Sequence, residues 1–180
     1  MINIISGYGD EAGAYLVSHP DVNHVVFTGS VITGKKILHM AADKAIPAIV
    51  ELGGKSAGIV YPDANLDDVV ESARHAIFGV AGQICTAMSR IVVHKSVKDE
   101  LIVKLVDLSK SLKVGPGYEE GTDLTPVISN NQLEKVEGYA RSGIQAGAEA
   151  VHGGKRIDRD GYFMEATVLN NVTQDMTVAR

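Results

Sequence analysis

Short apolar runs rich in β-branched residues alternate along the chain with longer segments in which apolar residues recur at helical spacing. The short runs predict buried strands and the periodic segments predict amphipathic helices. The predicted strands cover residues 25–27, 48–50, 57–60 and 91–93, with two more near 150–151 and 163–169. The predicted helices cover about 11–18, 32–42, 66–78, 97–112 and 130–146. Because helices separate most of the strands, the pattern predicts an α/β fold whose strands pair in parallel through right-handed crossovers.

The boundaries of these helices also have sequence signals. Pro20 should end the first helix, since the residue before a proline is pushed out of the helical region. The spacing in that helix predicts that Ala12, Tyr15 and Leu16 face the core.

Polar residues at the starts of the later helices predict their N-caps. Ser96 can cap the helix that begins near Val97, and Asn130 or Asn131 can cap the last long helix. The segment 79–86 has two glycines and little periodicity, which favours a loop.

The chain has 180 residues, which allows one domain or pieces of two. A boundary is expected near Gly53 and Gly54, where a predicted strand gives way to a glycine turn. This divides the chain into residues 1–53 and residues 54–180.

The charge balance restricts the class of partner. A net charge of −5 argues against binding to nucleic acid, and no apolar run is long enough to span a membrane. The first residues lack the positive region and apolar run of a signal peptide. A single cysteine excludes an internal disulfide and fits a reducing, cytoplasmic compartment.

One glycine turn is placed to bind an anion. Gly29 and Ser30 lie between the predicted strand 25–27 and the following helix, so free N–H groups at the helix start face this turn. The alternative is an ordinary strand-to-helix turn in which Ser30 caps the helix. Gly7, Gly9 and Gly13 have the wrong spacing for a dinucleotide fingerprint and are interpreted as turn residues.

Glu51 ends a predicted strand and precedes two glycines. Open α/β sheets bind ligands beyond such strand ends, and a partly desolvated carboxylate there can act as a general base. The alternative is that Glu51 pairs with Lys55 or with a nearby helix end.

Cys85 lies in a glycine-containing segment that leaves room above its sulfur. A helix beginning near Cys85 would lower the pKa of the thiol and activate it as a nucleophile. The alternative is a small buried apolar residue. The six histidines show no metal-ligand spacing, so no metal site is predicted, and a Cys–His protease is poorly supported.

Three motifs occur in order along the chain: Phe-Thr-Gly-Ser at 27–30, Glu-Leu-Gly-Gly-Lys at 51–55 and Gly-Gln-Ile-Cys at 82–85. Together they closely resemble the aldehyde dehydrogenase superfamily. Further matching segments are 19–21, 62–64, 66–67, 112–115, 126–129 and 161–163. The resemblance therefore covers essentially the whole chain.

The resemblance implies roles for individual residues. Cys85 would be the nucleophile and Glu51 the general base of an NAD- or NADP-dependent oxidation of a small aldehyde. Gly29, Ser30 and Gly34 would lie near the cofactor, and Leu52 would contact its carboxamide end through the backbone. The fold would be a partial, Rossmann-like aldehyde dehydrogenase fold, with 1–53 from the cofactor domain and 54–180 from the catalytic domain.

The resemblance also implies an internal fragment, because family members are several hundred residues long and form homo-dimers or homo-tetramers. The isolated chain is expected to be a poor catalyst. Two alternatives remain: a CoA-acylating aldehyde dehydrogenase, and an inactive fragment that acts as a binding or structural module. Glu51 favours hydrolysis over acyl transfer to CoA, since the CoA-acylating branch generally lacks this Glu.

Overall fold

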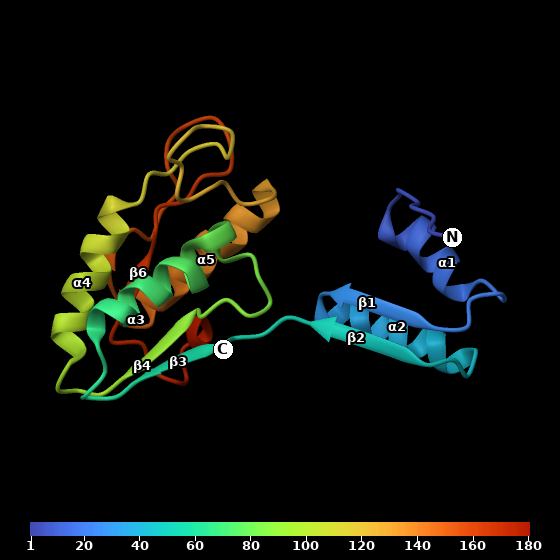
Figure 1. Cartoon of the computed structure of the whole chain (residues 1–180), viewed down its shortest axis with the longest axis horizontal. Coiled ribbons are helices and arrows are strands. Elements are labelled where there is room, and N and C mark those ends of the chain that lie inside the picture. The colour runs from blue at the N-terminus through green and yellow to red at the C-terminus, as the bar shows by residue number, and fades with distance from the viewer. The chain divides into compact units, whose positions relative to one another are not determined.

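A computed structural model describes residues 1–180, which form two compact units, Met1–Gly54 and Lys55–Arg180 (Figure 1). The N-terminal unit contains, in chain order, the π-helical turn η1 (Gly9–Gly13), α1 (Ala14–Ser18), β1 (Val25–Gly29), α2 (Val31–Asp43) and β2 (Ala48–Leu52). The parallel pair β1–β2, joined by the α2 crossover, matches the predicted α/β pattern.

The core of the N-terminal unit lies between α2 and one face of the β1–β2 pair. Val25 of β1 and Ile37 of α2 are buried there together with Val17 of α1. The next residue along β1, Val26, is 66% exposed, because successive side chains of a strand point to opposite faces. One face of this sheet therefore carries the helix and the other is open.

A lysine fixes the connection between α1 and β1. The Nζ of Lys44, at the end of α2, donates hydrogen bonds to the carbonyl oxygens of Val17, His19 and Val22, the last at 2.8 Å. These carbonyls lie at and beyond the C-terminal end of α1, where a helix leaves its carbonyls unpaired and favours a positive charge.

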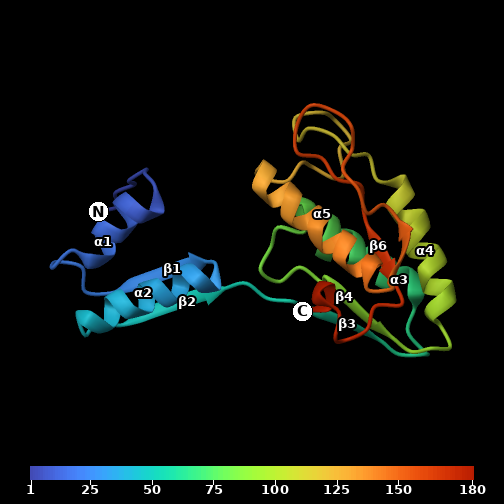
Figure 2. The same ribbon diagram turned by 180° about the vertical axis from the view of Figure 1, so that it is seen from behind.

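The C-terminal unit is built around a second parallel pair. Its elements are β3 (Ala57–Val60), α3 (Leu66–Ala73), the π-helical turn η2 (Arg74–Phe78), the 3-10 turn η3 (Gly79–Gly82), β4 (Arg90–Val93), α4 (Lys98–Ser111), α5 (Asn130–Gln145), β5 (Glu149–His152), β6 (Val168–Asn170) and the 3-10 turn η4 (Thr177–Ala179). β3 pairs with β4 in parallel, and β5 pairs with β6 in antiparallel fashion. Figure 2 shows α3, α4 and α5 around these strands.

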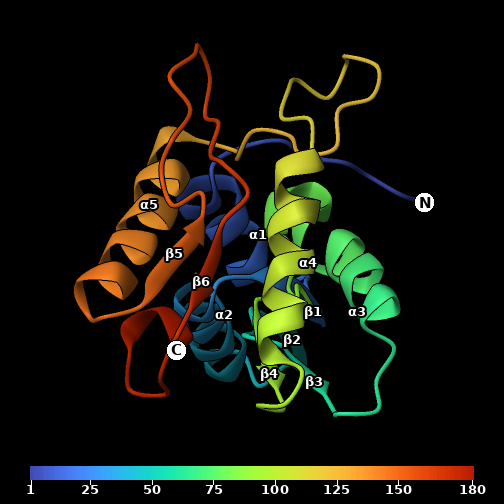
Figure 3. The ribbon, with the colours of Figure 1, turned by 90° about the vertical axis from the view of Figure 1, so that its left-hand side faces the viewer.

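Buried leucines of α3 and α4 hold this unit together. Leu66, Leu101 and Leu105 pack with Val60 of β3 in one apolar cluster. The connections that follow α4 and β5 extend beyond the helix ends on the same side of the unit (Figure 3). No helix combines the length and the apolar character that crossing a bilayer requires.

The structure corrects several local expectations. In α1 the buried residue is Val17, whereas Tyr15 and Leu16 are exposed. The last strand, β6, covers Val168–Asn170 and not 163–169, and it pairs with β5 in antiparallel fashion across a turn-rich connection.

The predicted caps of two helices are also wrong. Ser129, not Asn130 or Asn131, caps α5, and its Oγ accepts a hydrogen bond from the N–H of Gln132 at 3.2 Å. Ser96 instead bonds with the Nδ1 of His94, and α4 has no side-chain cap.

Replacement of the observed cap tests this correction. Ser129→Ala should lower the free energy of unfolding by about 1 kcal/mol, since a helix N–H loses its partner. Asn131→Ala should change it by a few tenths at most, because Asn131 makes no capping bond. Chemical denaturation of both variants measures the difference, and equal losses would contradict the assignment of Ser129.

An ion pair makes stability depend on pH. Glu137 of α5 accepts hydrogen bonds from Arg156 at 2.6 and 3.2 Å, and these bonds, with the charges of Arg156 and Arg141, hold the pKa of Glu137 below its usual value. The stabilisation is complete above the ordinary pKa of about 4.3 and is lost as pH falls through the lower folded-state pKa.

Glu137→Gln should therefore lower the melting temperature at pH 7 and have a much smaller effect at pH 3. Glu120→Gln, a change in an exposed side chain without an ion pair, serves as the control and should have little effect at either pH. Melting curves across this range decide, and a pH-independent effect of Glu137→Gln would contradict the ion-pair explanation.

Candidate active site

The turn between β1 and α2 contains Ser30 as the N-cap of α2. Its Oγ accepts a hydrogen bond from the N–H of Thr33 at 3.1 Å and lies 2.9 Å from the Thr33 hydroxyl. Its carbonyl accepts one from the N–H of Gly34 at 2.8 Å. Ser30 therefore caps the helix, as the alternative interpretation held. The N–H groups of Val31 and Ile32, which have no partner within the helix, remain to bind an anion.

The two glycines of this region have different roles. Gly29 is exposed at the end of β1, and a Cβ built on it would lie 2.5 Å from the Cζ of Phe27, so the absence of a side chain makes room for the Phe27 ring. Gly34 is buried, and a Cβ built on it would lie 2.5 Å from the Cδ2 of Leu52. Gly34 therefore allows α2 to pack closely against β2.

Glu51 lies next to this turn because of the register of the sheet. In the β1–β2 ladder, Thr28 is opposite Glu51 and Gly29 is opposite Leu52. Glu51 is exposed, and within the N-terminal unit its carboxylate makes no hydrogen bond or ion pair. The carboxylate is therefore free to accept a proton from a substrate or a water molecule.

Cys85 belongs to the C-terminal unit, where it is exposed in a turn that follows η3. The preceding 3-10 turn ends at Gly82, and no helix begins at Cys85. The condition for activation of the thiol by a helix N-terminus is therefore not met. The alternative of a buried apolar cysteine is wrong.

The backbone before Cys85 is strained. Val80 has φ 50° and ψ 31°, and Ala81 has φ 52° and ψ 36°, so two residues with side chains adopt the left-handed conformation in succession. Gly82, with φ 69°, continues this run. A left-handed residue with a Cβ costs about 1–2 kcal/mol, and a β-branched residue such as Val80 is rare there. Strain of this kind gathers at functional sites.

Hydrogen bonds hold the Cys85 turn on both sides. Before it, the side-chain amide of Gln83 accepts a bond from the N–H of Ile128 at 3.0 Å and donates one to the carbonyl of Val80 at 3.2 Å. After it, the N–H of Met88 donates to the carbonyl of Ala76 at 2.9 Å. The sequence placed Gln83 in the motif at 82–85 but predicted no role for its side chain, and it did not predict the left-handed run.

The candidate residues thus fall into two groups. Gly29, Ser30, Gly34, Glu51 and Leu52 gather at the carboxyl edge of the β1–β2 pair. Cys85 lies in the other unit. No three His, Cys, Asp or Glu side chains come together in a way that could hold a metal ion.

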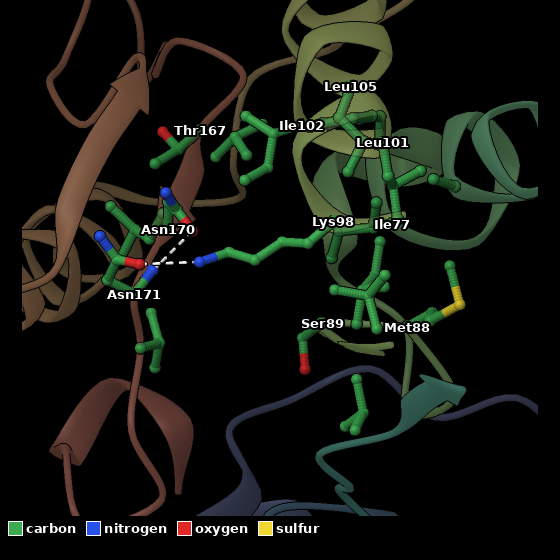
Figure 4. A pocket seen from close by; sticks show the side chains of 18 of the residues that line it. Ile77, Met88, Ser89, Lys98, Leu101, Ile102, Leu105, Thr167, Asn170 and Asn171 are labelled. Atoms are coloured by element: carbon green, nitrogen blue, oxygen red, sulfur yellow. Dashed lines mark hydrogen bonds between the residues drawn. The ribbon is translucent and has the colours of Figure 1, made fainter. Parts of the chain in front are cut away.

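A cavity of about 400 Å³ in the C-terminal unit is separate from Cys85. Leu101, Ile102 and Leu105 of α4 line one side, and Asn170 and Asn171 line the other. In Figure 4 the Nζ of Lys98 reaches across it and donates a hydrogen bond to the Oδ1 of Asn171 at 2.8 Å. Cys85 does not line this cavity.

Comparisons with known proteins match the whole chain. The sequence pattern of the "Aldehyde dehydrogenase family" matches residues 1–180. The chain is 41% identical to a mitochondrial aldehyde dehydrogenase of Leishmania tarentolae over 100% of this chain and 36% of the relative. It is 43% identical to a chloroplastic aminoaldehyde dehydrogenase of Arabidopsis thaliana, again over 100% of this chain and 36% of the relative. The chain therefore spans about 36% of the length of these relatives.

Solved structures show the same fold. An NAD+ complex of an aldehyde dehydrogenase from Bacillus cereus aligns with a TM-score of 0.92 and 38% identity, over 97% of this chain and 35% of that one. A betaine aldehyde dehydrogenase of Staphylococcus aureus in complex with NAD+ gives the same TM-score and identity, with the same coverage. The expected partial α/β fold is confirmed.

The strain before Cys85 can be tested at Val80, whose side chain is 62% exposed. Val80→Gly should raise the free energy of unfolding by roughly 1 kcal/mol, since glycine adopts the left-handed conformation without a Cβ penalty. Val103→Gly, at a similarly exposed site inside α4, should instead lower it by about 0.5–1 kcal/mol. Denaturation curves measure both, and destabilisation by Val80→Gly would contradict the strain.

Proposed function

The chain belongs to the aldehyde dehydrogenase family, and on that premise we propose that it carries the nucleophile and the general base of an enzyme that oxidises aldehydes to carboxylic acids with NAD or NADP. The observation that carries the proposal is the single thiol, Cys85, exposed in a strained turn held on both sides. We assign cofactor binding to residues 1–53 and the catalytic turn to residues 54–180.

The N-terminal unit has features that fit a dinucleotide. The start of α2 offers two N–H groups and the positive end of a 13-residue helix to a phosphate group. Gly29, exposed at the end of β1, adjoins this helix start, and Gly34 keeps α2 close to the strand that carries Leu52. Both of the similar solved structures described above are NAD+ complexes, which also supports a nicotinamide cofactor.

The first half of the proposed reaction takes place at Cys85. Its thiolate adds to the carbonyl carbon of the aldehyde, and the backbone N–H of Cys85 can donate a hydrogen bond to the oxyanion that forms. When the oxyanion collapses back to a carbonyl, the carbon loses its hydrogen and stays bound to sulfur as a thioester. The bound nicotinamide cofactor supplies the acceptor for that hydride.

The second half requires a base, which we assign to Glu51. Its carboxylate takes a proton from a water molecule as the water oxygen attacks the thioester carbon. The carbon–sulfur bond then breaks, which releases the carboxylic acid and restores the Cys85 thiolate. A free, exposed carboxylate at a strand end supports this role. The presence of Glu51 also favours water over CoA as the acyl acceptor, because the CoA-acylating branch that the sequence resembles less generally lacks this Glu.

The comparisons support an aldehyde as the substrate class. The similar proteins are named aldehyde, aminoaldehyde and betaine aldehyde dehydrogenases, so each name specifies an aldehyde as the substrate. Several are described as mitochondrial, chloroplastic or peroxisomal, so the cytoplasmic location that the composition favoured stays a prediction without support from them. Assembly into homo-dimers or homo-tetramers likewise stays a prediction.

Two substitutions separate the proposed roles in the whole protein that contains this sequence. Cys85→Ala should abolish NADH formation, because the proposed nucleophile is lost. In the 180-residue chain it should also abolish iodoacetamide labelling, because these residues contain no other thiol. Glu51→Gln should leave one rapid burst of NADH per site and slow later turnover by about 10²-fold or more, the usual contribution of a general base. Stopped-flow absorbance at the NADH band measures both phases.

Glu11→Gln, at another exposed carboxylate of the N-terminal unit, is the matched control and should behave like the parent protein. Turnover by Cys85→Ala would contradict the nucleophile. Loss of the burst itself in Glu51→Gln would contradict a role confined to hydrolysis. An acyl-CoA as the main product when CoA is added would favour the CoA-acylating alternative.

A further inference from the structure

We infer that Gln83 is a positioning residue that holds the Cys85 turn in the geometry required for catalysis; the inference rests on the proposed role of Cys85 as nucleophile. Gln83 precedes Cys85 by two positions. It does not act on the substrate. It acts through the backbone that carries the sulfur.

The Gln83 side chain joins two segments that are distant in the sequence. Its Oε1 accepts a hydrogen bond from the N–H of Ile128, 45 residues away, in the segment that leads into α5. Its Nε2 donates to the carbonyl of Val80, which also accepts a bond from the N–H of Gln83 itself. One amide therefore connects the strained run before Cys85 to the region where α5 begins.

This connection opposes the tendency of the run to relax. Val80 and Ala81 are held in the left-handed region, which their side chains disfavour, so the surrounding bonds must maintain that conformation. On the other side of the turn, the Met88 N–H bond to Ala76 provides a backbone anchor. On the N-terminal side of the turn, the Gln83 side chain links the backbone to Ile128, in the segment before α5.

The exposure of Gln83 distinguishes positioning from a contribution to stability. Its amide is exposed, so water can replace either hydrogen bond when the side chain is removed. The loss should therefore change overall stability little. The order of the turn should change more, because water cannot connect the strained run to the Ile128 backbone in one fixed geometry.

The single cysteine allows this order to be measured directly. A nitroxide spin label attached to Cys85 reports the motion of the turn in an electron paramagnetic resonance spectrum, without any need for turnover. In Gln83→Leu the label should move several-fold faster than in the parent chain. In Gln83→Glu it should show an intermediate mobility, because the carboxylate can still accept from the Ile128 N–H but cannot donate to Val80.

Gln145→Leu, at an exposed glutamine at the end of α5, is the matched control and should leave the spectrum unchanged. Melting temperatures should stay close to that of the parent chain for all three variants. An unchanged label mobility in Gln83→Leu would overturn the inference. So would a mobility change accompanied by unfolding of the whole unit, tested by circular dichroism of the same samples.

Turnover of the unlabelled whole protein provides the second measurement. Because a misplacement of about 1 Å can cost on the order of 10²-fold in rate, Gln83→Leu should lower kcat by roughly 10- to 100-fold with little change in KM for aldehyde or cofactor. Iodoacetamide, which needs only an accessible thiolate, should label Cys85 at nearly the parent rate. Parental kcat, or an equal loss of labelling and turnover, would overturn the positioning role.

The two proposals fail in different ways. If Cys85→Ala turns over, the nucleophile assignment fails and the positioning of a nucleophile fails with it. If Cys85→Ala is inactive and Gln83→Leu is unaffected in both mobility and kcat, only the role of Gln83 fails.

Discussion

The pairing of parallel strands is the constraint that brings the candidate residues of the N-terminal unit together. Strands that run in the same direction end at the same edge of the sheet, and a helix must return the chain between them. In the β1–β2 ladder this places Thr28 opposite Glu51 and Gly29 opposite Leu52. The turn at the start of α2 and the Glu51 carboxylate are therefore neighbours as a consequence of the register. Gly34 completes the arrangement, because a Cβ at this position would clash with the Leu52 side chain.

The C-terminal unit presents its candidate residue by a different physical means. No strand end or helix terminus holds Cys85, so its turn depends on a left-handed backbone run and on hydrogen bonds from Gln83 and Met88. A regular β-ladder can lose a hydrogen bond at its end and keep its geometry. A strained turn persists only while the surrounding structure holds it, so it depends on each of its few hydrogen bonds. The two units thus show two ways to orient chemical groups: through a regular ladder, and through irregular structure fixed by side chains.

The features that were predictable from the sequence are those set by periodicity and local chemistry. Apolar runs located β1 to β4, and the residues 27–30, 51–55 and 82–85 identified the family that the comparisons confirm. The residue that caps α5 was not predictable, because Ser129, Asn130 and Asn131 are all good caps and tertiary packing decides where the helix starts. The left-handed run at Val80 and Ala81 has no local signal either, since neither residue favours that conformation.

The Lys44 bonds imply an order of events as the chain leaves the ribosome. The carbonyls of Val17, His19 and Val22 that bind the ammonium group precede it by 27, 25 and 22 residues. The end of α1 and the connection to β1 therefore lack the Lys44 ammonium group until α2 has been synthesised, and the strand β2 follows within a few residues. The packing of α2 and the pairing of β1 with β2 can then form almost at the same time. The N-terminal unit is thereby expected to fold in one cooperative step once both α2 and β2 have been synthesised, and not by successive addition of finished elements.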